Sequence, residues 1–275
     1  MKKTLLDMHT HSTYSHDGQS SLKEMLETAL QMGLTYYGVC DHFNYDYDYT
    51  KMSAELRIKL QDAPPEEYFH GARHLQEDYA GCLNVIVGAE FGYSDDEQVK
   101  RRYQEEYRLY QPDYVMNSVH GVGGEDFCYC DLAGERKDVY QMYLGLIRRS
   151  LDVPYPYDIV GHIEYVARYV PFAEKSISLE EFGAEMDDIL QTIISKDKIL
   201  EVNTSTKTLP QGTLPNERIL RRYYELGGRK ISFGSDAHSV ERILDKWEQT
   251  VETLKKIGFT YLTVPIKGEY IKVEI

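Results

Sequence analysis

The sequence has few cysteines and no long apolar run. Four cysteines in 275 residues (Cys40, Cys82, Cys128 and Cys130) do not make a disulfide framework, so we expect reduced thiols. The absence of about 20 consecutive apolar residues excludes a membrane-spanning helix. Only two leucines precede Asp7 in the first apolar stretch, so we expect no secretory signal and a cytoplasmic protein.

Basic residues are also scarce. The chain has 31 basic and 45 acidic residues, which gives a net charge of −14 with neutral histidines. A chain this acidic lacks the broad basic surface that binding to nucleic acid requires, so we expect no nucleic-acid partner. A small anionic substrate remains compatible with this charge, because bound divalent cations reverse the sign of a local field.

Several nucleotide and hydrolase motifs are missing. The chain contains no Gly-Lys-Ser/Thr phosphate loop, no Gly-x-Ser-x-Gly elbow and no Pro-Cys-x-x-Cys deaminase signature. The glycine-rich segment 121–124 does not continue as a dinucleotide-binding motif. His70 and His74 have the spacing of a helical zinc pair but lack the accompanying glutamate, so we interpret them as an exposed helix face.

Short apolar runs alternate with longer amphipathic stretches. The runs are Leu5–His9, Tyr36–Asp41, Asn84–Glu90, Tyr114–His120, Ile159–His162, Ile199–Asn203 and Ile231–Ser235. The predicted helices are Leu22–Met32, Pro64–Tyr79, Glu97–Tyr110, Val139–Leu151, Ser178–Ser195, Pro215–Leu226 and Val240–Ile257. This alternation predicts an α/β fold, a distorted (β/α)7 barrel of parallel strands, as a single domain over residues 1–275. We expect the segment Phe43–Lys59 to form a long loop over the barrel mouth.

Seven of the nine histidines stand at or just after the ends of the apolar runs, where a parallel barrel carries its active site. Side chains two apart on a strand point the same way, so the pairs His9/His11 and Asp236/His238 each face one cavity. Nine candidate metal ligands result: His9, His11, Asp17, His42, Glu90, His120, His162, Asp236 and His238. This number and mixture of ligands predicts two to three divalent ions, Zn²⁺, Mn²⁺ or Fe²⁺.

The motifs resemble those of the PHP (polymerase and histidinol phosphatase) superfamily. The resemblance rests on five segments: residues 7–18 (DMHTHSTYSHDG), 38–42 (GVCDH), 88–90 (GAE) with 118–120 (SVH), and 234–238 (GSDAH). Chain length, together with residues 161–163 and Arg168-Tyr169, makes it most similar to the PHP-type histidinol-phosphate phosphatases of bacterial histidine synthesis.

This resemblance implies a trinuclear metal centre with three ligand sets. The first set is His9, His11, Glu90 and Asp236; the second is Glu90, His120 and His162; the third is Asp17, His42 and His238. Asp17 matches the family position eight residues after the first histidine, so His16 is placed outside the ligand set.

The resemblance implies a phosphate monoester hydrolase that converts L-histidinol phosphate to L-histidinol and phosphate, and we expect attack by a metal-bridging hydroxide. Arg168 is a candidate phosphate clamp or a surface residue, and Asn203 orients ligand or water or satisfies backbone groups. The resemblance implies that Glu90 bridges two ions, and we expect Asp236 or His238 to protonate the leaving group.

The nearest alternative is a PHP-type phosphoesterase for nucleotides or other small phosphorylated metabolites. An amidohydrolase-like enzyme usually has a strand-end lysine, which is missing here, and a non-enzymatic module would have lost ligands. The sequence leaves the native metal and the oligomeric state open.

Overall fold

The computed structural model describes residues 4–45, 47, 48, 50, 53, 55, 60–207 and 209–275. The loop expected over Phe43–Lys59 therefore lies largely outside the described residues. Within the described part, the structure contains no helix with both the length and the apolar character that crossing a bilayer requires.

Seven parallel strands form the barrel, and all seven coincide with the predicted apolar runs. They are β1 (Leu6–Asp7), β2 (Tyr36–Val39), β4 (Asn84–Gly92), β5 (Tyr114–Ser118), β8 (Ile159–Val160), β9 (Ile199–Asn203) and β10 (Ile231–Gly234). They pair in the order β1-β2-β4-β5-β8-β9-β10. The chain after β1 also bonds to β10 and the residues after it, since Met8 N–H donates to the Phe233 carbonyl at 2.9 Å and Asp236 N–H to the His9 carbonyl at 2.8 Å. These contacts confirm the distorted (β/α)7 barrel.

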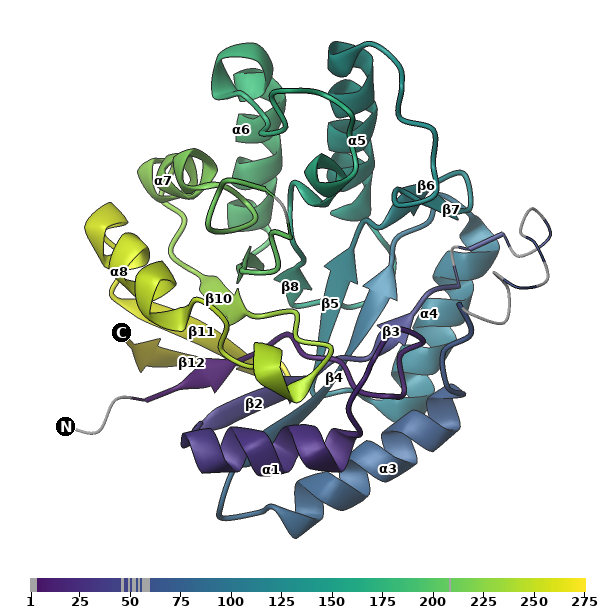
Figure 1. Cartoon of the computed structure of the whole chain (residues 1–275), viewed down its shortest axis with the longest axis vertical. Coiled ribbons are helices and arrows are strands. Elements are labelled where there is room, and N and C mark those ends of the chain that lie inside the picture. Colours follow the sequence, from purple (N-terminus) through teal and green to yellow (C-terminus); the bar gives the residue numbers. More distant parts are fainter. Residues whose placement is uncertain are drawn as a thin grey trace.

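Helices cover the outside of the barrel (Figure 1). They are α1 (Leu22–Met32), α3 (Pro65–Asp78), α4 (Glu97–Tyr110), α5 (Arg136–Ser150), α6 (Leu179–Ser195), α7 (Glu217–Glu225) and α8 (Trp247–Ile257). Local signals account for several of the boundaries. At α1, Ser21 and Glu24 form a reciprocal capping box and Gly33 ends the helix at a φ of 80°.

The predicted helix Val240–Ile257 is wrong in its first half. The structure has a short 3₁₀ helix, η3 (Val240–Arg242), followed by α8 beginning at Trp247. Leu244 and Lys246, between the two, have φ values of 58° and 59°, which a right-handed helix cannot accommodate. The Leu244 N–H donates to the buried Asp7 carboxylate at 3.0 Å instead of to a helical carbonyl. A tertiary hydrogen bond therefore replaces local helix formation here.

Three short additions lie outside the predicted pattern. Strand β3 (His42–Phe43) pairs with β4, β6 (Gly121–Val122) forms a hairpin with β7 (Glu125–Asp126), and β11 (Tyr261–Ile266) forms a hairpin with β12 (Glu269–Glu274). A second 3₁₀ helix, η2 (Tyr165–Arg168), follows β8. β3 carries His42, η2 carries Arg168, and the β6–β7 hairpin follows His120 directly. β3, η2 and the β6–β7 hairpin therefore shape the mouth of the barrel.

Candidate metal centre

Two histidines follow the first strand and face the barrel interior, as their alternate spacing predicts. His9 and His11 are buried, and their Nε2 atoms lie 2.9 Å apart. The neighbouring Asp7 anchors this segment by accepting hydrogen bonds from the Ser235 and Leu244 N–H groups. Burial raises the pKa of Asp7 to about 6, against the opposing effect of these hydrogen bonds.

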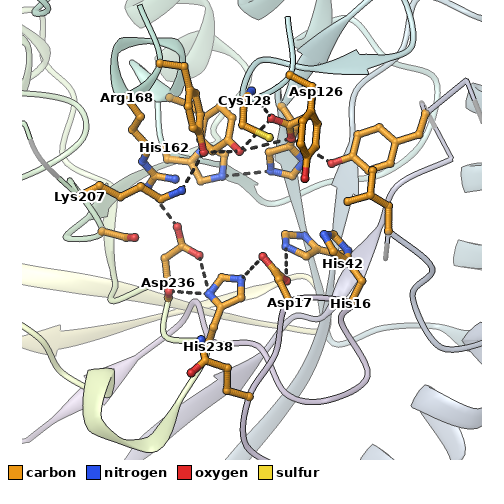
Figure 2. A pocket seen from close by; sticks show the side chains of 18 residues that line it. His16, Asp17, His42, Asp126, Cys128, His162, Arg168, Lys207, Asp236 and His238 are labelled. Atoms are coloured by element: carbon orange, nitrogen blue, oxygen red, sulfur yellow. Dashed lines mark hydrogen bonds and ion pairs between the residues drawn. The ribbon is translucent and has the colours of Figure 1, made fainter. Parts of the chain in front are cut away.

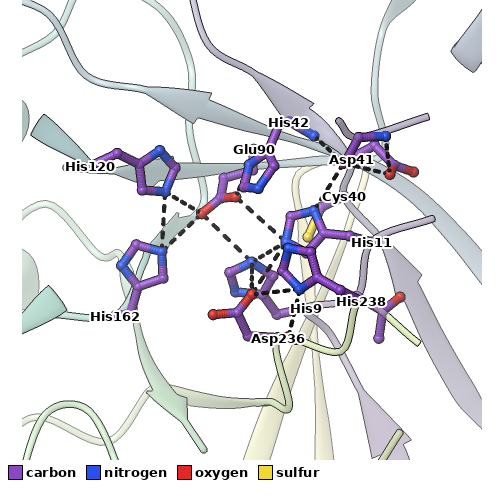
Figure 3. A network of polar contacts seen from close by, with 12 residues as sticks. His9, His11, Cys40, Asp41, His42, Glu90, His120, His162, Asp236 and His238 are labelled. Atoms are coloured by element: carbon purple, nitrogen blue, oxygen red, sulfur yellow. Dashed lines mark hydrogen bonds and ion pairs between the residues drawn. The ribbon is translucent and has the colours of Figure 1, made fainter. Parts of the chain in front are cut away.

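Glu90, at the end of β4, occupies the middle of the cluster (Figure 3). One carboxylate oxygen, Oε1, lies 3.1 Å from His120 Nε2 and 3.0 Å from His162 Nε2. The other, Oε2, lies 2.7 Å from His42 Nδ1. Burial alone would raise the pKa of Glu90, but the charges of His120, His9 and His42 hold it well below its usual range. Glu90 is therefore an ionised carboxylate in contact with imidazoles from three other segments.

Asp236 and His238 approach from the end of β10. Asp236 Oδ1 lies 3.4 Å from His11 Nε2 and 3.7 Å from His9 Nε2. The Asp236 backbone has a φ of 54°, an uncommon conformation for a residue other than glycine, which aims its carboxylate at this pair. His238 Nε2 lies 3.1 Å from Asp17 Oδ2, and His42 Nε2 lies 3.6 Å from Asp17 Oδ1.

All nine predicted ligands thus lie in one cluster, and the donor atoms fit divalent cations. Ligand atoms about 2.1 Å from a tetrahedral zinc ion are separated by about 3.4 Å, near the 3.1 Å and 3.0 Å that separate Glu90 Oε1 from His120 and His162. Glu90 Oε2 is buried and has no hydrogen-bond partner among the described residues, although His42 Nδ1 is 2.7 Å away. A cation bound to both atoms would satisfy them without a hydrogen bond between them. Four groups of three side chains have the proximity that a metal ion needs: His11/His42/His238, His9/His11/Glu90, His9/His162/Asp236 and His42/Glu90/His120.

One important carboxylate, Glu201, was missed from the sequence, and a second, Asp41, was noted only as part of the 38–42 motif. Glu201, in the middle of β9, lies 2.5 Å from His9 Nδ1 and accepts the His162 N–H at 2.5 Å. Asp41 accepts hydrogen bonds from the Ser12 and Ser15 N–H groups and so fixes the loop after His11. The available signal for Glu201 was a single charge inside an otherwise apolar run.

Arg168 and Asn203 meet at the same carboxylate, Asp236. Arg168 Nη2 donates to Asp236 Oδ2 at 3.2 Å and to Asn203 Oδ1 at 3.4 Å. Asn203 Nδ2 donates to Asp236 Oδ2 at 3.3 Å. Arg168 is buried, so the surface interpretation of this residue is wrong, because η2 turns its side chain back into the barrel mouth.

The cluster opens into a cavity of about 370 Å³ (Figure 2). Its lining includes Arg168, Lys207, Asp126 and several tyrosines beside the histidines. A cavity with metal-ligand groups at its floor and basic side chains on one wall suits a small anionic substrate.

His16 borders the cluster without joining the ligand set, whereas the helical pair His70 and His74 lies apart from it. His16 Nδ1 is 2.7 Å from Asp62 Oδ1, and its ring stacks on that of His42 at 5.7 Å. His70 and His74 are exposed on α3, as expected for a solvated helix face.

Comparisons with known proteins agree with this geometry. The chain is 28% identical over 269 residues to the histidinol-phosphatase of Lactococcus lactis subsp. lactis strain IL1403, covering 94% of this chain and 93% of that protein. It is 27% identical to a probable histidinol-phosphatase of Thermotoga maritima, covering 94% and 95%.

A crystal structure of the L. lactis histidinol phosphate phosphatase, complexed with zinc, L-histidinol and phosphate, superimposes with a TM-score of 0.81. The two chains are 25% identical, and the superposition covers 97% of this chain and 98% of that one. The PHP domain family matches residues 7–205, which is well over half of the chain. The chain therefore belongs to the PHP domain family.

Proposed function

We propose that this protein is a phosphoric monoester hydrolase that converts L-histidinol phosphate to L-histidinol and phosphate. The observation that carries the proposal is the position of Glu90 at the centre of a buried set of imidazoles and carboxylates, beneath a cavity with basic side chains. The similarity to the L. lactis enzyme, whose crystal structure contains zinc, L-histidinol and phosphate, supports the choice of substrate.

The nine clustered side chains would hold two to three divalent ions, Zn²⁺, Mn²⁺ or Fe²⁺. We assign His9, His11, Glu90 and Asp236 to one ion. His120 and His162 share Glu90 Oε1 and would hold a second ion, for which Glu90 is the bridge. Asp17, His42 and His238 would hold a third, supported by the 3.1 Å and 3.6 Å contacts of Asp17.

Divalent ions bound here would lower the pKa of a water molecule and neutralise the phosphoryl oxygens. Arg168 is the proposed phosphate clamp, because its guanidinium lines the cavity and is held in place by Asp236. Asn203 orients Arg168 and Asp236 through its side-chain amide. Positioning of this kind is the main contribution that side chains make to phosphoryl transfer.

The two proposed proton carriers, Asp236 and His238, are in direct contact. His238 Nδ1 donates to the Asp236 carbonyl at 2.9 Å, and its Nε2 lies 3.1 Å from Asp17 Oδ2. Asp236 has a second carboxylate oxygen facing Arg168 and the cavity. We therefore propose that one member of this pair, Asp236 or His238, transfers a proton to the leaving oxygen.

The test is a phosphate-release assay on protein loaded with Mn²⁺, Zn²⁺ or Fe²⁺. The panel contains L-histidinol phosphate, nucleoside monophosphates and sugar phosphates. The proposal predicts the highest kcat/KM for L-histidinol phosphate. A higher value for a nucleoside monophosphate would instead support the alternative of a nucleotide phosphoesterase on the same fold.

A further inference from the structure

One acidic side chain on the cavity wall has no part in the chemistry described above. Asp126, in β7, is 5% exposed and lines the same cavity as Arg168. In Figure 2 it lies with Cys128 along the top of the cavity, whereas Asp17 and His238 lie at the bottom. A carboxylate in this position repels a phosphate group, so Asp126 does not serve to bind the phosphate of an ester.

Among the described residues, the side chains and N–H groups that donate to the Asp126 carboxylate are neutral. Its donors are the Tyr47 hydroxyl at 3.0 Å, the Cys128 N–H at 2.8 Å and the Tyr165 hydroxyl at 3.4 Å. Within the described part of the chain, no lysine, arginine or histidine forms an ion pair with it. A buried carboxylate is stabilised most by a cation that also hydrogen-bonds to it, and the described residues supply none.

A chain of hydrogen bonds leads to this carboxylate. Lys207 Nζ donates to the Tyr169 hydroxyl at 2.9 Å, the Tyr169 hydroxyl to that of Tyr165 at 3.2 Å, and the Tyr165 hydroxyl to Asp126. The chain of hydrogen bonds begins at Lys207 and ends at Asp126, which accepts the last one. Tyrosine rings on the cavity wall add surfaces that favour an organic cation.

The distance from the metal centre suits the far end of a small substrate. The Tyr165 ring lies 4.9 Å from the His162 ring and 5.3 Å from the His120 ring, while its hydroxyl reaches Asp126. One tyrosine side chain thus separates the proposed metal ligands from the carboxylate. An ester with its phosphate at the metal centre would bring the alcohol half toward Asp126.

We propose that Asp126 is a specificity residue that binds a positively charged nitrogen in the alcohol half of the substrate. This inference rests on the function proposed above, because it takes the phosphate to lie at the metal centre. It extends that function from one compound to a chemical class, the phosphate monoesters of amino alcohols. Esters of neutral alcohols and sugars would leave the buried carboxylate without a cation.

The experiment uses the metal-loaded enzyme and two esters of nearly equal size, O-phosphoethanolamine and n-propyl phosphate. They differ chiefly in an ammonium group in place of a methyl group. We expect the wild type to have a kcat/KM for O-phosphoethanolamine that is higher by about tenfold, as a charge-assisted hydrogen bond implies. Equal values for the two esters in the wild type would overturn the inference, with no variant needed.

Asp126→Asn removes the charge but keeps an oxygen that accepts the Cys128 N–H. We expect the ratio of the two kcat/KM values to fall to about one, mainly through a higher KM for the cationic ester. Asp131→Asn is the matched control, since Asp131 is exposed on the same loop and caps only the Ala133 N–H. An unchanged ratio in Asp126→Asn would contradict the inference, as would an equal loss on both esters.

Assays with L-histidinol phosphate separate the two proposals. If the ratio depends on Asp126 but L-histidinol phosphate is not hydrolysed, the inference stands and the proposed substrate is wrong. If L-histidinol phosphate is hydrolysed equally well by wild type and Asp126→Asn, the proposed function stands and the inference fails.

Discussion

Glu201 Oε1 lies 2.5 Å from His9 Nδ1, and the two side chains are completely buried, 192 positions apart in the chain. Burial lowers the pKa of His9, but the charges of Glu201, Glu90 and Asp236 raise it well above its usual range. The contact leaves Nε2 of His9 directed at His11 and the metal centre. A carboxylate on the far nitrogen of a ligating histidine orients the ring and increases its basicity.

Replacing Glu201 with Gln should therefore weaken metal binding. We expect the affinity for the metal to fall by about 10–100-fold, as for other partners of ligating histidines. Competition with a chromophoric chelator measures this change. Glu241→Gln is the control, because Glu241 is exposed near η3. Unchanged affinity in Glu201→Gln would show that Glu201 has a structural role only.

Glu90→Gln should abolish turnover and reduce the bound metal while leaving the fold largely intact. Gln has the shape of Glu but lacks the charge that the proposed bridge between two ions requires. Metal content by elemental analysis, turnover and far-ultraviolet circular dichroism should be measured on the same preparation. An active, metal-replete variant would refute the bridging role.

Arg168→Ala should lower kcat/KM for phosphate esters by at least about tenfold, through a higher KM, because it removes a charge-assisted contact to phosphate. The change also leaves Asp236 without its 3.2 Å donor, so a fall in kcat is expected as well. Steady-state kinetics on two different esters would measure the loss, which should affect both. Arg221→Ala, in the exposed pair with Glu217, is the control, and kinetics matching this control would remove Arg168 from the site.

Removal of the metal should inactivate the enzyme reversibly and lower its melting temperature. An ion that binds only the folded state stabilises that state, so a chelator removes both activity and stability. Low pH should also release the metal and so lower activity and stability. Metal-bound imidazoles must be neutral, and protons compete for them as the pH falls below about 6.5. Calorimetry with and without chelator, together with metal retention from pH 8 to 5, tests this expectation.

Gly88→Ala should destabilise the barrel. An added Cβ would come within 2.3 Å of the buried Tyr114 ring, whose hydroxyl bonds to the Met8 carbonyl across the barrel. Overpacking of this kind costs about 1–3 kcal/mol of unfolding free energy. Gly183→Ala, in α6, has open space around the new Cβ and should stabilise by roughly 0.5–1 kcal/mol. Chemical denaturation should therefore give opposite signs for the two variants.

Local sequence signals were sufficient for most of the fold. Each apolar run became a strand, because a strand buried on both faces must be apolar, and the capping box at Ser21 marked the start of α1. The break between η3 and α8 had no local signal. It depends on Asp7, which is distant in the chain and accepts the Leu244 N–H in place of a helical carbonyl.

The sequence by itself determined which residue types stand at the strand ends, and a parallel barrel brings all strand ends to one mouth. For that reason eight of the nine candidate ligands were predictable from the strand ends, and the ninth, Asp17, from the motif of residues 7–18. Only the tertiary structure decided the partners that position them: Glu201 on His9, Asp41 on the loop after His11, and Arg168 against Asp236. Hydrogen bonds between distant segments depend on the direction of individual side chains. Strand periodicity specifies only on which face of the sheet a side chain lies.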